Sequence, residues 1–555
     1  MRRTLSNILF CFCFPSVFFL SGRCLAGDLV ISSDRDVYIA GDRLYFSILL
    51  TGEDESRSDY VYLVLGAESG NAVFTGCLKV QNNHAYGTIF LNDTLSTGIY
   101  QLVSYTNRMR NFSSSFYARK TIGVVNRFDN TFDGLFSGQI PEINSVMANG
   151  PQEDKSFLTP EISTDKTSYL QREKISLRIT LPAGWREKPV SLSVRQVAPV
   201  AFISSPVPQK EASTPDPCFY FPEKAGLVLQ GTLKDENRNP VAGRPVFLSC
   251  EDSVANLQYE ITHSGGIFRF FLNPYYFGKT LMIKSDNTFK GEIEIDDKFS
   301  SGHQPFTSRM VVTEGWEKFL RKSQKYMTIR KSYRNDWMKE TVLPGNLGGY
   351  RPSVYFTTPY VVFPSDFTYL PDFMEISREI LPFMKTRQRN DKFEASVIDL
   401  DINDYTSVYI FVDGVLIEGV EQIISLDSKK IGKIETVTNS RFIGDLRIPG
   451  IVSITTPAHE IRKLQWRFPV VKREAGQILN PTGYYPPVPE TIPKSLPDFR
   501  ELLYWEPAPD FSGKNTLSIE TYASDCTGDF EVLLTTTGRN GERIEFRKLF
   551  NVVHP

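Results

Sequence analysis

The chain has 555 residues, with 62 Lys and Arg residues against 64 Asp and Glu residues and a formal net charge of −2. At this balance the whole chain carries no nucleic-acid-binding footprint, and its length exceeds what one hydrophobic core usually supports. The 40 Phe and 25 Tyr residues, in short runs punctuated by 34 Pro and 37 Gly residues, favour β-sandwiches over helical bundles. We therefore expect a mainly β chain of several domains.

Residues 1–26 have the features of a secretory signal peptide. A basic start precedes an apolar run at residues 8–20, and Ala26 supplies the small residue before the cut. The apolar run is too short to span a membrane as a helix. Cys24 could suggest a lipid anchor, but Arg23 occupies a position where a small residue would be expected. We expect cleavage after Ala26 and an exported mature chain.

Four cysteines remain after this cleavage, and they are far apart in the sequence: Cys77, Cys218, Cys250 and Cys526. In an oxidising compartment they could form disulfides, with three possible pairings. Four buried free thiols are the other reading, and the sequence leaves both open.

Two segments share one pattern near their first strands. Asp34 is followed by a basic residue and then by Tyr38, and Asp165 and Tyr169 repeat this spacing. An internal repeat of this kind indicates a duplicated structural unit. Both segments resemble the opening of alpha-2-macroglobulin-type domains, which implies a β-sandwich at residues 27–126, a linker at 127–157 and a second sandwich at 158–224.

The two copies differ at one turn position. The first copy has Gly41 there, as the resemblance implies, whereas the second has Arg172. A turn with positive φ must therefore be accommodated differently in the second copy.

The segment 225–300 forms a further β unit. Leu227 opens a strand that ends at Asp235, and Pro240, Val241 and Gly243 follow it at short spacing. This order resembles the carboxypeptidase regulatory-like domain, a small non-catalytic sandwich. Residues 301–349 then turn helical and locally basic, which predicts a connector with a solvated face.

Residues 350–457 predict a small α/β unit. A β-branched and aromatic run ends at Asp413 and Gly414, a strong turn signal. Two further strands are expected, one at residues 431–437, which include Glu435, and one at residues 450–456, which begins at Gly450. The order resembles the plug domain of TonB-dependent outer-membrane receptors of the Bacteroidetes type. The Gly-rich loop of such plugs is replaced by residues 441–446, and the chain after the unit is too short for a 22-strand barrel, which needs roughly 200 residues in strands.

The chain then continues with a Pro-rich linker at residues 458–496. Residues 497–555 resemble the immunoglobulin-like segment of macroglobulin-type proteins. Trp505 is expected either in the core of that sandwich or as a wedge between domains.

We find no motif for catalysis, a cofactor or a metal. His459 and Glu460 begin like a zinc-protease helix, but Lys463 replaces the second ligand. The Cys-Gly-Glu-Gln thioester of protease-trapping macroglobulins is absent at every cysteine, including Cys77.

Three functions remain open. The first is a non-enzymatic envelope protein of the periplasm or the periplasmic face of the outer membrane, which presents its plug-like domain to a barrel or secretion partner. Peripheral membrane association is compatible with it, and no nucleic-acid partner or small-molecule substrate is indicated. The second is a glycan- or peptide-binding module that uses exposed aromatic residues such as Tyr484 and Tyr485. The third is an enzyme with an unfamiliar site.

Overall fold

The computed structural model describes residues 29–51, 58–129, 159–185, 188–204, 219–224, 226–302, 304–333, 353–355, 359–390, 392–400, 402–476, 478–488, 493, 495–511, 513–538 and 541–555. The expected signal peptide, nearly all of the expected 127–157 linker and Cys218 lie outside these ranges. Within them, no helix is both long enough and apolar enough to cross a membrane.

The first sandwich is built from strands β1 (Leu29–Ser33), β2 (Val37–Ile39), β3 (Arg43–Leu50), β4 (Tyr60–Ala67), β5 (Ala72–Lys79), β6 (His84–Phe90), β7 (Gly98–Tyr105), β8 (Ala118–Val125) and the late strand β32 (Ile478–Leu479). One sheet has the order β1-β3-β6, and the other has the order β2-β8-β7-β4-β5-β32. Side chains alternate along β3, so that Leu44 and Phe46 enter the core while Tyr45 points outward.

The second sandwich is built from strands β9 (Glu161–Thr164), β10 (Ser168–Leu170), β11 (Lys174–Thr180), β12 (Val190–Gln196), β33 (Leu502–Glu506), β34 (Thr516–Tyr522), β35 (Gly528–Thr537) and β36 (Arg543–Val553). Its sheets have the orders β9-β11-β34 and β10-β36-β35-β12-β33. When the eight strands of this sandwich are matched in chain order with β1–β8, the two sheet orders are the same as in the first sandwich, which has β32 in addition. The two copies therefore share one topology.

This pairing corrects the expected domain boundaries. Strand β12 pairs with both β33 and β35, so residues 158–224 and 497–555 do not fold as separate domains. The first four strands of the sandwich come from the earlier segment and the last four from the C-terminal segment. Everything between β12 and β33 is an insertion at the position where the first sandwich has only the short β4–β5 connection. Hairpin tips of this kind tolerate insertions because little buried backbone is disturbed.

A two-stranded ribbon and a helix form the part of this insertion that lies beside the first sandwich. Strand β13 (Val200–Ser204) pairs antiparallel with β20 (Ser308–Val312), and helix α1 (Trp316–Ser332) follows. The buried face of α1 includes Leu320 and Met327, which pack in one cluster with Val37 and Val125 of the first sandwich. This apolar stripe holds α1 against the first sandwich.

A third sandwich is built from strands β14 (Leu227–Lys234), β15 (Pro245–Cys250), β16 (Gln258–Ile261), β17 (Ile267–Leu272), β18 (Thr280–Ser285), β19 (Glu292–Ile295) and β31 (Val470–Glu474). Its sheets have the orders β17-β14-β19 and β16-β15-β18-β31. The segment 458–496 is thus more than the expected linker, because it supplies β31 here and β32 to the first sandwich.

The remaining elements form the distal α/β unit (residues 360–455). They are β21 (Tyr360–Val362), α2 (Phe373–Glu379), β22 (Met384–Arg389), β23 (Lys392–Asp399), β24 (Asp404–Ser407), β25 (Tyr409–Val412), β26 (Val415–Leu416), β27 (Lys433–Val437), β28 (Arg441–Ile443), β29 (Leu446–Ile448) and β30 (Ile451–Thr455). The main sheet has the order β21-β27-β30-β25-β26, in which β25 and β30 run parallel. Strands β22-β23-β24 form a second sheet and β28-β29 a small hairpin.

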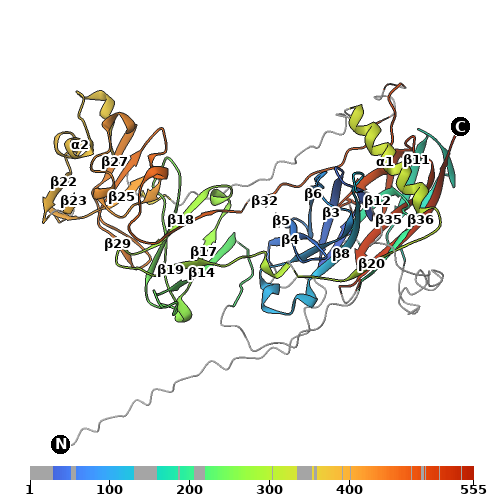
Figure 1. Cartoon of the computed structure of the whole chain (residues 1–555), viewed down its shortest axis with the longest axis horizontal. Coiled ribbons are helices and arrows are strands. Elements are labelled where there is room, and N and C mark those ends of the chain that lie inside the picture. The colour runs from blue at the N-terminus through green and yellow to red at the C-terminus, as the bar shows by residue number, and fades with distance from the viewer. Residues whose placement is uncertain are drawn as a thin grey trace, which may run out of the picture.

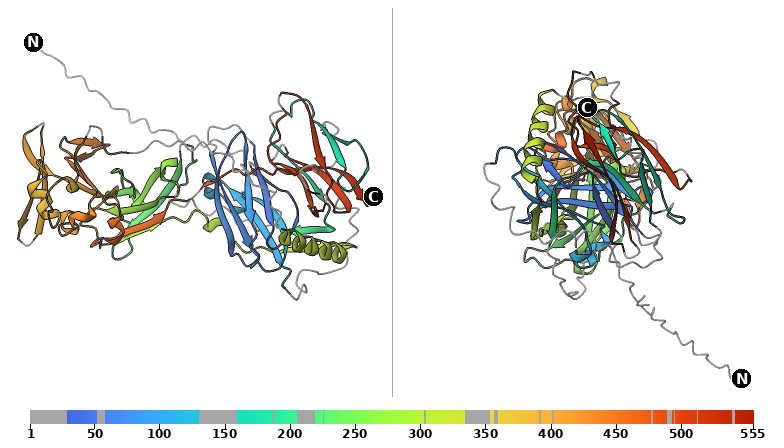
Figure 2. Two further views of the ribbon diagram at one scale, coloured as in Figure 1. Left: turned by 90° about the horizontal axis from the view of Figure 1, so that it is seen from above. Right: turned by 90° about the vertical axis from the view of Figure 1, so that its right-hand side faces the viewer.

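The four units follow one another along an elongated molecule (Figure 1). The distal α/β unit lies at one end, next to the third sandwich, and the second sandwich with the C-terminus lies at the other end. A view turned by 90° shows the same order, with the first sandwich between the second and the third (Figure 2).

Candidate functional site

The Asp-Tyr pattern of the first copy closes a turn between β1 and β3. The Tyr38 hydroxyl donates a hydrogen bond to Oδ1 of Asp34 at 2.6 Å, and the Tyr45 amide donates to the same oxygen at 2.9 Å. Asp34 and Tyr38 are both buried. The motif is therefore a structural clamp that orders the turn.

The second copy repeats this geometry. The Tyr169 hydroxyl donates to Oδ1 of Asp165 at 2.6 Å, and the Ser176 amide donates to the same oxygen at 2.8 Å. At the turn position Gly41 has a φ of +92°, and Arg172 adopts a φ of +60°. Two hydrogen bonds of 2.7 Å from its guanidinium to Asp525 hold Arg172 in this left-handed conformation. That is how the second copy accommodates the turn without glycine.

The basic residue that follows the aspartate has different surroundings in the two copies. Arg35 is buried and contacts three carboxylates, those of Asp34 at 3.0 Å, Asp42 at 2.8 Å and Glu501 at 3.1 Å. Lys166, its counterpart, pairs with Glu173 at the surface. Because Glu501 belongs to the segment that leads into β33, the Arg35 cluster joins the two sandwiches.

A second ion-pair cluster crosses the same interface. Arg195 of β12, with 2% of its side chain exposed, contacts Asp36 of the first sandwich at 2.7 Å and Glu531 of β35 at 2.8 Å. Lys120 also contacts Asp36, at 2.5 Å. The two sandwiches therefore face each other through buried, mutually compensated charges.

An aromatic cluster completes this interface. Trp505 is buried in one cluster with Tyr45, Tyr484 and Leu502, so it is a wedge between domains rather than a core residue of one sandwich. The Tyr484 hydroxyl donates to the Leu502 carbonyl at 2.6 Å. This corrects the expectation that Tyr484 is an exposed binding aromatic, although Tyr485 is exposed.

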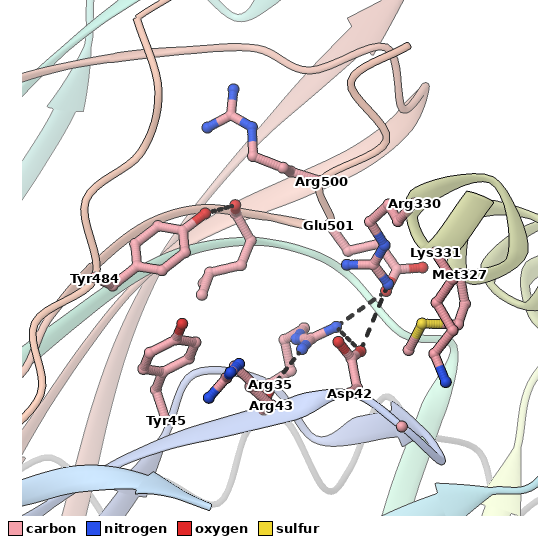
Figure 3. A pocket seen from close by; sticks show the side chains of 12 residues that line it. Arg35, Asp42, Arg43, Tyr45, Met327, Arg330, Lys331, Tyr484, Arg500 and Glu501 are labelled. Carbon is pink, nitrogen blue, oxygen red and sulfur yellow. Dashed lines mark hydrogen bonds and ion pairs between the residues drawn. The ribbon is translucent and has the colours of Figure 1, made fainter. Parts of the chain in front are cut away.

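The Arg35 cluster and the aromatic cluster border a cavity of about 270 Å³, the candidate site (Figure 3). Figure 3 shows Arg35 from the first sandwich, Glu501 from the second and Arg330 from α1 converging beside Asp42. Arg330 lies 3.6 Å from the Asp42 carboxylate. Three chain segments that are distant in the sequence thus meet at one carboxylate.

The electrostatics of the cavity follow from burial and from this pairing. Burial alone would raise the pKa of Asp42, but attraction to Arg35 and Arg330 outweighs it and lowers the pKa. For Asp34 the loss of solvation is the stronger influence, and its pKa is raised despite the neighbouring Arg35. The arrangement lies where the two sandwiches and α1 meet, and its ion pairs join them.

Asp413 and Gly414 lie elsewhere, in the two-residue turn between β25 and β26. Both residues have positive φ, 47° and 84°, as this hairpin turn requires. The buried Asp413 carboxylate accepts hydrogen bonds from the Thr456 amide at 2.6 Å and the Thr456 hydroxyl at 2.7 Å. The Asp252 amide of the third sandwich donates to the Asp413 carbonyl at 2.8 Å, so the turn also docks the distal unit.

Gly450 stands immediately before β30, where its carbonyl accepts a hydrogen bond from the Tyr409 amide at 2.9 Å. A side chain there would contact the Val437 carbonyl. The motif residues therefore occupy separate joints of the molecule and do not converge on one site.

Several residues of the candidate site carried no sequence signal. Arg35 stood inside the repeated pattern, but nothing local marked Glu501, Arg195 or Arg330 as its neighbours. Cys77 and Cys526 are buried free thiols, and the buried Cys250 sulfur lies 3.8 Å from the Tyr275 hydroxyl oxygen. In the described part of the chain, no group of three or more His, Cys, Asp or Glu residues is placed to hold a metal ion.

Comparison with known proteins gives a likeness to solved structures alone. No family profile and no curated protein matches the sequence. Alpha-2-macroglobulin of Salmonella reacted with methylamine is 8% identical, with 96% of this chain and 40% of that chain covered and a TM-score of 0.24. Alpha-2-macroglobulin of Escherichia coli activated by porcine elastase is 10% identical, with 95% and 44% covered and a TM-score of 0.23.

A putative membrane-anchored protein of Corynebacterium diphtheriae is 12% identical, with 52% of this chain and 59% of that chain covered and a TM-score of 0.15. The chain thus spans less than half the length of the two macroglobulins, and TM-scores this low carry no argument about function. The expected fold class is confirmed: the chain is a mainly β, multidomain protein of sandwiches with one small α/β unit.

Proposed function

We propose that this chain is a non-enzymatic protein of the cell envelope that presents its distal α/β unit, as a plug-like domain, to an outer-membrane barrel or a secretion component. The order of its strands along the sequence motivates the plug-like assignment. The sandwiches act as a rigid stalk, because buried ion pairs and aromatic contacts fix the first against the second. The distal unit lies at the end of the molecule opposite the C-terminus (Figure 1), where a partner has access to it.

One observation carries this proposal. Five large apolar side chains are exposed within ten residues of the distal unit, which we call the apolar strip: Tyr360, Val361, Phe363, Phe367 and Tyr369. Exposed apolar side chains that gather in one place mark interaction surfaces, whereas isolated ones are ordinary. The strip begins in the edge strand β21, which pairs only with β27 in the described residues.

Site-specific crosslinking in intact cells tests the proposal. A photoreactive amino acid at Phe363 is expected to form a covalent adduct with an envelope protein, because the partner would cover the apolar strip. The control position is Phe90, which is 56% exposed on the first sandwich and far from the strip. Identical adducts from both positions, or no adduct from Phe363, would contradict the proposal.

Cell fractionation tests the location separately. The mature protein is expected with the periplasm or the outer membrane, shortened at its N-terminus by the cleavage predicted after Ala26. Recovery of the full-length chain in the cytosol would contradict an envelope role.

A further inference from the structure

The second sheet of the distal unit has one buried and one open face. Met384 of β22 and Val397 of β23 are buried against the core of the unit. Because side chains alternate along a strand, Lys385, Arg387 and Arg389 of β22 share the opposite face, and all three are exposed. The β22-β23-β24 sheet therefore turns a row of cations to solvent.

The strand register concentrates this charge further. Arg389 is directly opposite Lys392 of β23, and like charges in that position destabilise a sheet. Arg387 is opposite Glu394, the one carboxylate on this face among the described residues. None of the four cations forms an ion pair within the part of the chain that the structure describes. No described residue therefore compensates the repulsion between Arg389 and Lys392. An anion that approaches this face would reduce that repulsion.

Apolar groups extend the same face beyond the cations. Ile398 of β23 is paired with Tyr405 of β24, and the exposed Leu400 follows. The Lys385 ammonium lies 3.6 Å from the centre of the Tyr405 ring. The face therefore changes from cationic at the β22–β23 turn to aromatic and aliphatic at its other end.

We propose that this basic face (Lys385, Arg387, Arg389, Lys392, Tyr405 and Leu400) binds the surface of a membrane that contains anionic phospholipids. Lys and Arg side chains pair with lipid phosphates, and Tyr and Leu side chains are accommodated at the level of the headgroups. A lipid surface fits better than an acidic protein for two reasons. The cations lie in a row along an open sheet instead of around a pocket, and exposed apolar groups continue the row. Figure 1 places β22 and β23 at the extreme end of the molecule, where a flat surface can reach them.

Vesicle co-sedimentation of the full mature chain tests this proposal. We expect binding to vesicles of phosphatidylcholine with 30% phosphatidylglycerol, weakening as salt is added, and no binding to phosphatidylcholine alone. The double variant Arg387→Gln/Arg389→Gln should bind about 30-fold more weakly, since each cation near an anionic surface contributes a roughly fivefold effect. Both side chains are exposed, so the variant is expected to fold, and its thermal unfolding midpoint should match that of the wild type.

The matched control removes equal charge elsewhere. Lys472→Gln/Arg473→Gln changes two exposed cations on β31 of the third sandwich and should leave vesicle binding unchanged. If both double variants lost vesicle binding equally, the effect would depend only on the overall charge of the protein, and the proposal would be overturned. Absence of vesicle binding by the wild type would also overturn it, and capture on immobilised poly-glutamate in that case would assign the face to an acidic protein.

Discussion

At the residue scale, duplication gives a controlled comparison between Arg35 and Lys166. Arg35 contacts three buried carboxylates, whereas Lys166 pairs with one surface carboxylate. Arg35→Met is expected to lower the free energy of unfolding by about 3–5 kcal/mol, because it leaves buried charge uncompensated. Urea denaturation of the two methionine variants measures this, and Lys166→Met should be nearly neutral. Equal effects would contradict the assigned role of Arg35.

A pH effect is expected from Lys284 in β18. Burial lowers its pKa to about 8, and its ammonium donates to the Ile417 carbonyl at 3.3 Å. The folded-state pKa lies below that of the unfolded chain, so the unfolded chain binds more protons between pH 8 and roughly 10.4 and stability rises with pH across this window. Below pH 8 Lys284 is charged in the folded chain, and the burial of its charge lowers the free energy of unfolding by the full amount, about 3 kcal/mol.

Lys284→Met should therefore raise the free energy of unfolding at pH 7, and the gain should shrink by pH 10. Urea unfolding at both pH values checks this, with Lys472→Met on the exposed part of β31 as the control. A gain that does not depend on pH would reject the ionisation argument.

At the scale of elements, the β25–β26 hairpin joins the distal unit to the third sandwich. An added Cβ at Gly414 would lie 2.8 Å from the Asp252 amide nitrogen and 2.8 Å from the Cys250 carbonyl oxygen, whereas Gly444, which also has positive φ, has open space. Gly444→Ala should cost about 1 kcal/mol of backbone strain. Gly414→Ala should cost about 2 kcal/mol more, because backbone atoms must shift.

Urea unfolding of the two alanine variants checks the difference, and amide hydrogen exchange locates it. The Asp252 amide donates to the Asp413 carbonyl, so its exchange should accelerate in Gly414→Ala and stay slow in Gly444→Ala. Unchanged protection of Asp252 in both variants would show that the turn does not carry the joint.

At the scale of the whole molecule, the interrupted second sandwich determines which truncations fold. Because β12 and β33 are hairpin neighbours, a variant chain with residues 198–499 replaced by a short Gly-Asn-Gly turn should retain both sandwiches, apart from the edge strand β32 of the first. It should unfold cooperatively with lowered stability, since α1 and Tyr484 are lost from the joint. Circular dichroism and thermal unfolding measure this.

The matched truncation removes the C-terminal segment that the sequence suggested was a separate domain. Deletion of residues 497–555 takes away β33–β36, half of the strands of the second sandwich, and leaves β12 without partners. This shorter deletion is expected to unfold the second sandwich and to cause aggregation. If the deletion left a folded second sandwich, the shared fold of the two segments would be refuted.

The sequence by itself determined the local features of this protein. The Asp-Tyr clamps and the Asp413-Gly414 turn were readable because each is set by residues close together in the chain, where spacing and backbone preference decide the geometry. The fold class was predictable for the same reason, because composition and the alternation of residues within short strands are local properties of the sequence.

Only the tertiary structure decided which segments share a sandwich and which charges meet. The pairing of β12 with β33 and the contact of Arg35 with Glu501 join residues that are far apart in the sequence. An alternating strand pattern fixes which face is buried but does not name the partner strand. Ion pairs across domains also leave no periodic trace, so the joint between the sandwiches became visible only when the chain was folded.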